Sequence, residues 1–370
     1  MSYYDTVLEY KQYGRTLPLK NFSRDHLKKA IYAGEVTAGQ FACLLSQEAE
    51  DSLEEMACRS HELTLRYFGR TVQLYTPIYL SNHCDNKCVY CGFNSGNDLN
   101  RKKLGFEEVE NEARLISSTG LKHILVLTGD SRKESPVSYI RDCIKILRKY
   151  FSSISIEVYA LTEGEYAELV SVGVDALTIY QEVYDEDIYS SVHPLGPKRN
   201  YKFRLDAPER GARSGLRKVN IGTLFGLGDW RREVFLMGLH AKYLQDKYPD
   251  VEIGASIPRI RPHAGAFRPL VEVSDKNIVQ AIVSLRIFLP RLSMSVSTRE
   301  DPKFREDILP LGITSMSAGS TTYVGGHSMD IYEKGLVPQF EISDKRSVGE
   351  VKAMLEGKGY QPVFKDWMCI

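Results

Sequence analysis

The chain has 370 residues, 43% of them hydrophobic and 26% charged, and its 48 Lys and Arg residues balance 48 Asp and Glu residues. A chain with no net charge does not attract the phosphate backbone as a whole, so nucleic acid is not expected as a partner. The sequence holds neither a signal-peptide core nor an apolar run of about eighteen residues, the length that a membrane helix needs. We therefore expect no membrane contact and a location in the cytoplasm.

Residues 1–73 are predicted to form a helical N-terminal extension. Apolar residues recur at intervals of three and four within 25–36, 37–47 and 50–68, which is the spacing of an amphipathic helix. From Leu74 onward the pattern changes to short apolar runs separated by amphipathic stretches. This change of pattern places a boundary near residue 73.

Strand-like and helix-like segments alternate from residue 74 to residue 319. Strands are expected at 74–82, 122–130, 153–161, 174–182, 217–229, 251–260, 291–300 and 313–320. Helices are expected at 106–120, 138–150, 164–173, 208–215, 230–247, 276–288 and 302–309. About eight such repeats favour an α/β fold, a (β/α)8 barrel of the TIM type, and no G-x-G-x-x-G motif supports a dinucleotide-binding fold instead. Residues 320–370 are expected to be a short C-terminal appendage of loop and one closing helix.

Three of the seven cysteines, Cys84, Cys88 and Cys91, fall within eight residues directly after the first predicted strand. That is the end of a barrel strand at which active sites form. Three thiolates can hold three irons of a 4Fe–4S cluster and leave the fourth iron open for another ligand. The alternative is a zinc-stabilised binding protein in which His83, Cys58 or another distant residue supplies a fourth ligand.

The spacing Cys84-x3-Cys88-x-Tyr90-Cys91 resembles that of the radical S-adenosylmethionine (SAM) enzymes. In that family the open iron binds the amino and carboxylate groups of SAM, and an added electron cleaves the sulfonium to give a 5′-deoxyadenosyl radical. The stretches 193–215, 220–231, 256–265 and 295–300 resemble the aromatic-amino-acid lyases of the same superfamily. This resemblance runs from the helical extension to about residue 320 and covers most of the chain.

The resemblance implies a lyase that breaks the Cα–Cβ bond of L-tyrosine and yields 2-iminoacetate (dehydroglycine) and p-cresol, for the thiazole moiety of thiamine. It also implies thiazole synthase as the partner that takes the unstable imine, and a flavodoxin or ferredoxin as electron donor. Two relatives stay open as alternatives, the tyrosine lyase that matures FeFe-hydrogenase and a tryptophan lyase. The former carries a C-terminal extension with a further cysteine-bound cluster, whereas this sequence ends at Cys369 and Ile370.

Polar residues at predicted strand ends are the candidates for binding SAM. Glu157 is a charge in an apolar strand and needs a partner, which is either an ion pair or, by resemblance, the SAM ribose. By resemblance, the glycine-rich motif after the second strand binds the SAM ammonium. The resemblance also implies that an arginine binds the SAM carboxylate and that an aromatic residue contacts the SAM adenine. The alternatives are that the glycine-rich motif is a plain turn, that the arginine is solvated and that the aromatic residue belongs to the core. The residues concerned are Thr128, Gly129, Asp130, Arg204 and Tyr90.

Ser297, Arg299 and Glu300 end the predicted seventh strand and are the candidates for binding the substrate. The Arg299 guanidinium can form a bidentate pair with an amino-acid carboxylate, to which Ser297 adds a hydrogen bond. The alternative is a salt bridge on the barrel rim between Arg299 and Glu300 or another neighbour. Gln181 and Glu182 close the fourth strand, where they can contact SAM or the substrate. No catalytic residue is assigned beyond the cluster ligands.

Overall fold

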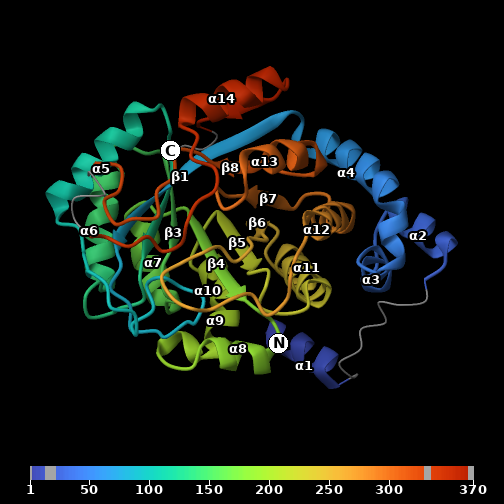
Figure 1. Ribbon diagram of the computed structural model, residues 1–370, viewed down its shortest axis with the longest axis horizontal. Helices are drawn as coiled ribbons and strands as arrows, with labels where there is room; N and C mark the ends of the chain where they lie inside the picture. Colours follow the sequence, from blue (N-terminus) through green and yellow to red (C-terminus); the bar gives the residue numbers. More distant parts are fainter. Residues whose placement is uncertain (1, 13–21, 329–334, 366–370) are drawn as a thin grey trace.

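Eight parallel strands close into a barrel in the computed structural model, which describes residues 2–12, 22–328 and 335–365 (Figure 1). Strand neighbours follow the chain order from β2 to β8, and β1 pairs with both β8 and β2 to complete the ring. The strands are β1 (Thr71–Ser81), β2 (His123–Thr128), β3 (Ser153–Glu157), β4 (Ala176–Glu182), β5 (Lys218–Thr223), β6 (Glu252–Ser256), β7 (Ser293–Val296) and β8 (Ser315–Ser317). The predicted (β/α)8 fold is confirmed.

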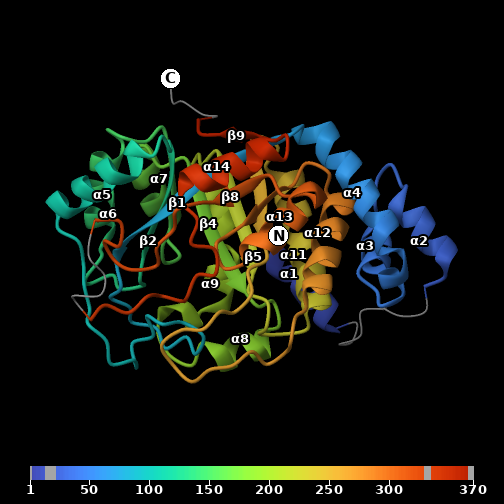
Figure 2. The same ribbon diagram turned by 45° about the horizontal axis from the view of Figure 1, so that its top comes forward.

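Helices surround the barrel and connect successive strands (Figures 1 and 2). They are α5 (Phe106–Ser118), α6 (Val137–Leu147), α7 (Glu163–Ser171), α8 (Glu186–Val192), α9 (Tyr201–Leu205), α10 (Ala207–Arg213), α11 (Trp230–Lys247), α12 (Asp275–Phe288) and α13 (Pro302–Ile308). The sequence did not predict α8 and α9, which have seven and five residues and begin at the side-chain caps Asp185 and Asn200. Three 3-10 turns, at Glu48–Ser52, Pro197–Arg199 and Leu309–Leu311, were also not predicted.

Local sequence signals explain where these elements begin and how they are buried. Every residue of β2 is buried, as expected of a parallel strand that is covered on the inside by barrel side chains and on the outside by helices. The Thr162 hydroxyl accepts a hydrogen bond from the Glu165 backbone N–H and caps α7, and Ser274 caps α12 in the same way. Apolar runs therefore determine which segments become buried strands, and capping residues determine where the helices begin.

The N-terminal helices α2 (Arg24–Ile31), α3 (Ala38–Leu44) and α4 (Leu53–Phe68) lie in the three segments predicted to be helical, whereas α1 (Tyr3–Gln12) was not predicted as a separate helix. The N-terminal helices share the core of the barrel. Phe41 of α3 stacks on Phe288 of α12 with ring centroids 4.1 Å apart. Tyr3 of α1 stacks on the His240 ring at 4.2 Å and donates a hydrogen bond to the Leu236 carbonyl at 2.5 Å. His240 is buried there.

The chain after β8 returns to the barrel. α14 (Val348–Gly357) is the predicted closing helix, and β9 (Gln361–Val363), which was not predicted, pairs in parallel with the start of β1. Residues 338–344, here called the C-terminal strap, lie against the loops at the strand ends; the Glu341 N–H, for example, bonds the Pro262 carbonyl at 2.8 Å. The division of the chain at residues 73 and 319 stays a prediction, and Cys369 lies outside the described residues.

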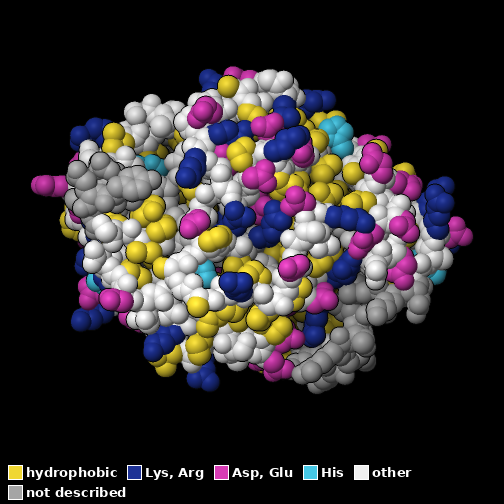
Figure 3. Space-filling view, in the orientation of Figure 1, with side chains coloured by type: hydrophobic (Ala, Val, Ile, Leu, Met, Phe, Trp, Pro, Cys, Tyr) yellow, Lys and Arg dark blue, Asp and Glu magenta, His cyan; other side chains and the backbone are white. Residues whose placement is uncertain are grey.

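The surface shows no dominant charge. On the face seen in Figure 3, basic and acidic side chains are interspersed, in keeping with the balanced composition. No helix in the described parts of the chain has the length and apolar character needed to cross a membrane.

Candidate active site

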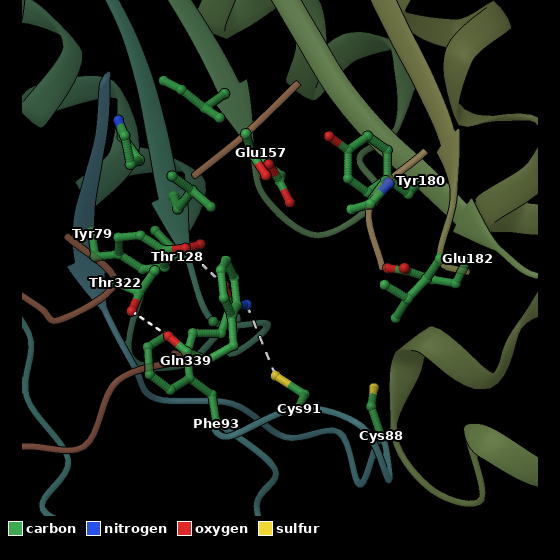
Figure 4. A pocket seen from close by; sticks show the side chains of 18 of the residues that line it. Tyr79, Cys88, Cys91, Phe93, Thr128, Glu157, Tyr180, Glu182, Thr322 and Gln339 are labelled. Carbon is green, nitrogen blue, oxygen red and sulfur yellow. Dashed lines mark hydrogen bonds between the residues drawn. The ribbon is translucent and has the colours of Figure 1, made fainter. Parts of the chain in front are cut away.

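A cavity opens at the carboxyl ends of the barrel strands and contains about 1290 Å³ of space free of protein atoms, part of it continuous with solvent. Its walls bring together side chains from the cysteine loop, from the ends of several strands and from the C-terminal strap (Figure 4). The cavity is lined by every residue that the sequence proposed for the cluster, SAM or substrate except Gln181 and Glu300. The barrel topology thus brings together site residues proposed from the sequence that lie up to 215 positions apart, from Cys84 to Arg299.

The cysteine loop, residues 82–103, leaves β1 without forming a helix or a strand of its own. Arg101 holds it from within, because its guanidinium donates to the carbonyls of Asn82, Phe93 and Asn94 at 2.7, 2.8 and 2.7 Å. Backbone hydrogen bonds then fix it to its surroundings; the N–H groups of Asp85, Lys87 and Val89 donate to the carbonyls of Asp130, Leu195 and Val192 at 2.8, 3.0 and 3.1 Å. The cysteines therefore sit on a braced loop.

The three cysteines are free thiols on the wall of one cavity. Burial raises the pKa of Cys84 to about 12 and also raises the pKa values of Cys88 and Cys91, so binding of a metal centre by these thiols has to release their protons. Within the described ranges, no three His, Cys, Asp or Glu residues converge on a point suited to a single metal ion. A cluster is wider than one ion and takes each thiolate on a different iron, so a cavity lined by three thiols fits its donor set.

The segment after β2 approaches the cysteine loop closely. The Gly129 N–H donates to the Ser81 carbonyl at 2.8 Å, and a Cβ at Gly129 would overlap the His83 carbonyl. The Asn86 side chain donates to the Asp130 carboxylate at 2.7 Å. The Thr128 hydroxyl oxygen is buried without a hydrogen-bond partner in the described structure, so it is free for a polar ligand.

Glu157, at the end of β3, points into the cavity (Figure 4). Its carboxylate forms no hydrogen bond or ion pair with a described residue. Burial and the nearby Glu182 raise the pKa of Glu157 to about 7, although Arg299, Lys198 and Arg204 act in the opposite direction. The sequence led us to expect a partner for Glu157, and no described residue pairs with its carboxylate as an ion. The carboxylate can instead accept a hydrogen bond from a ligand hydroxyl.

Glu182 ends β4 at a break in the strand register and has a φ angle of 71°. A left-handed backbone is uncommon for a residue other than glycine and is held there by its surroundings, at a cost of about 1–3 kcal/mol. The Lys198 ammonium lies 2.7 Å from its carboxylate and the Arg204 guanidinium lies 3.7 Å away. Arg204 also donates to the Tyr180 carbonyl at 2.7 Å. These three charges form a buried group on the cavity wall.

Tyr90, between the second and third cluster cysteines, is fixed by His193. The His193 Nδ1 lies 2.8 Å from the Tyr189 carbonyl and so carries the proton, which leaves Nε2 to accept from the Tyr90 hydroxyl at 2.6 Å. Burial lowers the pKa of His193 to about 2, so the imidazole stays neutral. The Tyr90 ring is thereby held in the cavity wall.

Arg299 and Glu300, which the sequence placed together, face different surroundings. The Arg299 guanidinium stacks on the Phe340 ring at 3.4 Å and lines the cavity beside Ser297. Glu300 does not line this cavity but pairs with Arg259, whose Nε donates to both carboxylate oxygens at 3.1 and 3.0 Å. Arg299 forms no ion pair with the described residues, so the rim salt bridge between Arg299 and Glu300 is absent from them.

Gln181 is buried outside the cavity, and both polar atoms of its side chain lack hydrogen-bond partners within the described structure. Asn86, Lys198, Gln339 and Phe340 are among the residues of the cavity wall that were not assigned from the sequence. Asn86 and Lys198 lie within segments that the cysteine spacing and the family resemblance had already singled out. Gln339 and Phe340 carried no local signal, because only the return of the C-terminal strap brings them to the cavity.

Comparison with known proteins agrees with this geometry. Residues 78–237 match the Radical SAM superfamily, and residues 256–361 match the Biotin and Thiamin Synthesis associated domain. The chain is 37% identical to 2-iminoacetate synthase of Salmonella typhimurium (strain LT2) and 38% identical to that of Escherichia coli (strain K12), in each case over 92% of this chain and 90% of the relative.

Among solved structures, the chain is similar to a crystal structure of HydG, a maturase of the FeFe-hydrogenase. The TM-score is 0.88 with 32% identity, over 98% of this chain and 80% of that one. Because the sequence identity to 2-iminoacetate synthases extends over nearly the full length, it shows to which family of the Radical SAM superfamily the chain belongs. The chain therefore belongs to the radical SAM aromatic-amino-acid lyases, as a relative of 2-iminoacetate synthase.

Proposed function

We propose that this radical SAM lyase cleaves the Cα–Cβ bond of L-tyrosine, releasing 2-iminoacetate and p-cresol, and so supplies the thiazole moiety of thiamine. The observation that carries the proposal is a single cavity at the strand ends that holds three cysteines, a set of polar residues suited to SAM, and Arg299 with Ser297. The relatives named 2-iminoacetate synthase support the choice of reaction.

Cys84, Cys88 and Cys91 would hold a 4Fe–4S cluster with one open iron. When bound, the cluster and SAM supply a 5′-deoxyadenosyl radical that removes a hydrogen atom from the substrate. Thr128, Gly129 and Asp130 are proposed to receive the SAM ammonium, and the carboxylates of Glu157 and Glu182 its ribose hydroxyls. Arg204 is proposed to pair with the SAM carboxylate and Tyr90 to contact the adenine. All of these residues line the cavity.

The substrate is proposed to lie between the cofactor residues and Arg299. This arginine has its charge on the cavity wall with no ion pair to a described residue, so its guanidinium can bind an amino-acid carboxylate in a bidentate pair. The Phe340 ring packs against one face of the guanidinium and leaves its edge to the ligand. Ser297 adds a hydroxyl at the same wall. The barrel walls shield the sides of the cavity from water.

The partners proposed with this reaction are thiazole synthase, which would take the imine before it hydrolyses, and flavodoxin or ferredoxin as electron donor. We also propose a cytoplasmic location. The six cysteines in the described parts of the chain are free thiols, the form that a reducing compartment maintains.

Product analysis tests the proposal. Protein reconstituted with iron and sulfide without oxygen is incubated with SAM, a chemical reductant and either L-tyrosine or L-tryptophan in parallel. We expect p-cresol, glyoxylate from hydrolysed 2-iminoacetate, and 5′-deoxyadenosine with tyrosine only. The Cys91→Ala variant should form none of these products, whereas Cys58→Ala, an exposed cysteine, should match the wild type.

Each alternative gives a different result. An indole-derived product would indicate a tryptophan lyase, and iron beyond one 4Fe–4S cluster with the same tyrosine products would indicate the hydrogenase-maturing type. Deoxyadenosine without any amino-acid product would reject tyrosine as substrate. Colourless protein that holds zinc and does not cleave SAM would reject the enzyme altogether.

A further inference from the structure

We propose that Gln339 is a positioning residue that donates a hydrogen bond to the Cys91 sulfur and thereby raises the reduction potential of the cluster bound there. The Gln339 Nε2 lies 3.8 Å from the Cys91 Sγ (Figure 4). Gln339 belongs to the C-terminal strap, which no cysteine motif includes. The inference rests on the proposed ligation of iron by Cys91.

The backbone of Gln339 is fixed on both sides. Its carbonyl accepts from the Gly92 N–H at 3.0 Å, and its own N–H donates to the Thr322 carbonyl at 3.0 Å. A Cβ at position 92 would lie 2.6 Å from the Pro338 carbonyl, so only glycine lets the strap approach this closely. The backbone of Gln339 is therefore fixed to Gly92, the residue next to Cys91, and this keeps its side chain near the Cys91 sulfur.

The orientation of the amide is also determined. The Tyr79 hydroxyl donates to Gln339 Oε1 at 2.8 Å, which turns the NH2 group toward the sulfur. Burial raises the pKa of Tyr79 well above its ordinary value, so the hydroxyl keeps its proton and stays a donor. The ring of Tyr79 packs edge-on against Phe93 at 5.9 Å. Tyr79, Gln339 and Cys91 thus form one directed chain of hydrogen bonds.

An N–H donor beside a cluster thiolate stabilises negative charge on the sulfur. One-electron reduction adds negative charge to the cluster, so the hydrogen bond favours the reduced form more than the oxidised form and raises the potential. The electron comes from the reductant, which is oxidised, and no proton needs to move at Gln339. The strap would in this way ease the reduction that starts the reaction.

The test measures the potential of the cluster, not turnover. Wild type, Gln339→Leu, Gln339→Glu and the control Gln361→Leu are reconstituted without oxygen, checked for iron and sulfide content, and titrated with redox mediators without SAM, while paramagnetic resonance follows the reduced cluster. Gln361 is exposed on β9, and among the described residues its side chain bonds only the neighbouring Pro362 carbonyl.

We expect Gln339→Leu to lower the equilibrium constant for reduction about tenfold, which for one electron corresponds to about 59 mV. Gln339→Glu should lower it further, because a carboxylate repels the added electron, and Gln361→Leu should leave it unchanged. A fully loaded Gln339→Leu cluster with the wild-type potential would overturn the proposal.

A variant that fails to assemble the cluster does not decide the matter, so Tyr79→Phe provides the second measurement. It keeps Gln339 but removes the group that orients the amide, and we expect a smaller shift in the same direction. Wild-type potentials in both Tyr79→Phe and Gln339→Glu would overturn the inference. A shifted potential without p-cresol would reject the tyrosine reaction and leave the inference intact, whereas a full cluster in Cys91→Ala would remove its basis.

Discussion

The Lys198 ammonium lies 2.7 Å from the Glu182 carboxylate in the wall of the cavity, with both side chains almost fully buried. Glu182 has a left-handed backbone, and Lys198 is held by its own backbone N–H, which donates to the Asn86 side chain at 2.9 Å. The pair therefore connects β4 to the cysteine loop, because Asn86 belongs to that loop. Asn86 also bonds Asp130 after β2. A cation that the sequence left unassigned here neutralises a carboxylate proposed to bind SAM.

Lys198→Met should therefore lower the free energy of unfolding by about 2–3 kcal/mol, since a buried carboxylate loses its main partner and keeps only Arg204 at 3.7 Å. SAM should also bind at least about tenfold more weakly, because an unbalanced Glu182 rearranges the wall. Chemical unfolding and equilibrium binding of SAM to the reconstituted protein measure the two effects.

Lys202→Met is the matched control. Lys202 pairs with Asp206 one helical turn away, its side chain is 54% exposed, and the pair is expected to contribute less than about 1 kcal/mol. Equal losses in the two variants would show that the buried pair has no special role.

Gly129→Ala should disturb the cysteine loop without changing any ligand. The added methyl group would overlap the His83 carbonyl and lie 3.2 Å from the Cys84 Cβ, both of them parts of the braced loop. We expect the reconstituted variant to hold less than half of the wild-type iron and to lose activity in proportion. Iron analysis and the absorption of the cluster provide the measurement.

The control for this substitution is Gly164→Ala in the first turn of α7, where an added Cβ meets no atom within 4 Å. This change should leave the iron content unaltered and stabilise the helix by about 0.5–1 kcal/mol. Full iron loading in Gly129→Ala would mean that the loop has more freedom than its hydrogen bonds indicate.

Substitution of Arg299 should affect substrate binding, whereas substitution of Glu300 should affect the stability of the fold. Arg299→Met removes the only proposed cation for the substrate carboxylate, and KM for tyrosine should rise by about 10–100-fold. Glu300→Gln should leave KM within about twofold but destabilise the fold by about 1–3 kcal/mol, because Arg259 loses a buried carboxylate partner. Steady-state kinetics at saturating SAM, with chemical unfolding of the same preparations, distinguish the two.

A large rise in KM for Glu300→Gln would show that Glu300 contributes to substrate binding, as the sequence had led us to expect. The sequence could not make this distinction. Neighbouring residues after a strand end point in different directions once the chain turns, and Arg259, the partner that holds Glu300, lies 41 positions earlier in the chain.

The barrel and the cysteine site could be predicted from the sequence because both depend on local patterns. The strand and helix periods repeat along the chain, and the three cysteines lie within eight residues of one another. Gln339 shows where such reasoning ends. It is 248 positions from Cys91, and only the folded path of the C-terminal strap places it beside that sulfur. The short helices α8 and α9 were missed for a different reason, since caps and tertiary contacts, not a period, define them.

Glu157 should make the stability of the protein without cofactors depend on pH. Its pKa is about 7 in the folded protein, against 4.5 ordinarily, so the folded state holds the proton over a range in which the unfolded state has released it. The free energy of unfolding therefore falls as the pH rises from 4.5 to about 7, and it does not fall further through this group at higher pH. The loss is at most about 3 kcal/mol, and smaller to the extent that water enters the open cavity.

Glu157→Gln removes this titration. We expect the variant to be more stable than the wild type by about 1–3 kcal/mol at about pH 8, with the difference vanishing near pH 4.5, in chemical unfolding of cofactor-free protein at both pH values. The same variant should bind SAM more weakly once reconstituted, because an amide cannot replace a carboxylate that accepts from two hydroxyls. Glu35→Gln, which alters an exposed carboxyl group, should change neither property. Stability gained at high pH together with lost SAM affinity would identify Glu157 as a charge kept in the apolar strand for its ligand.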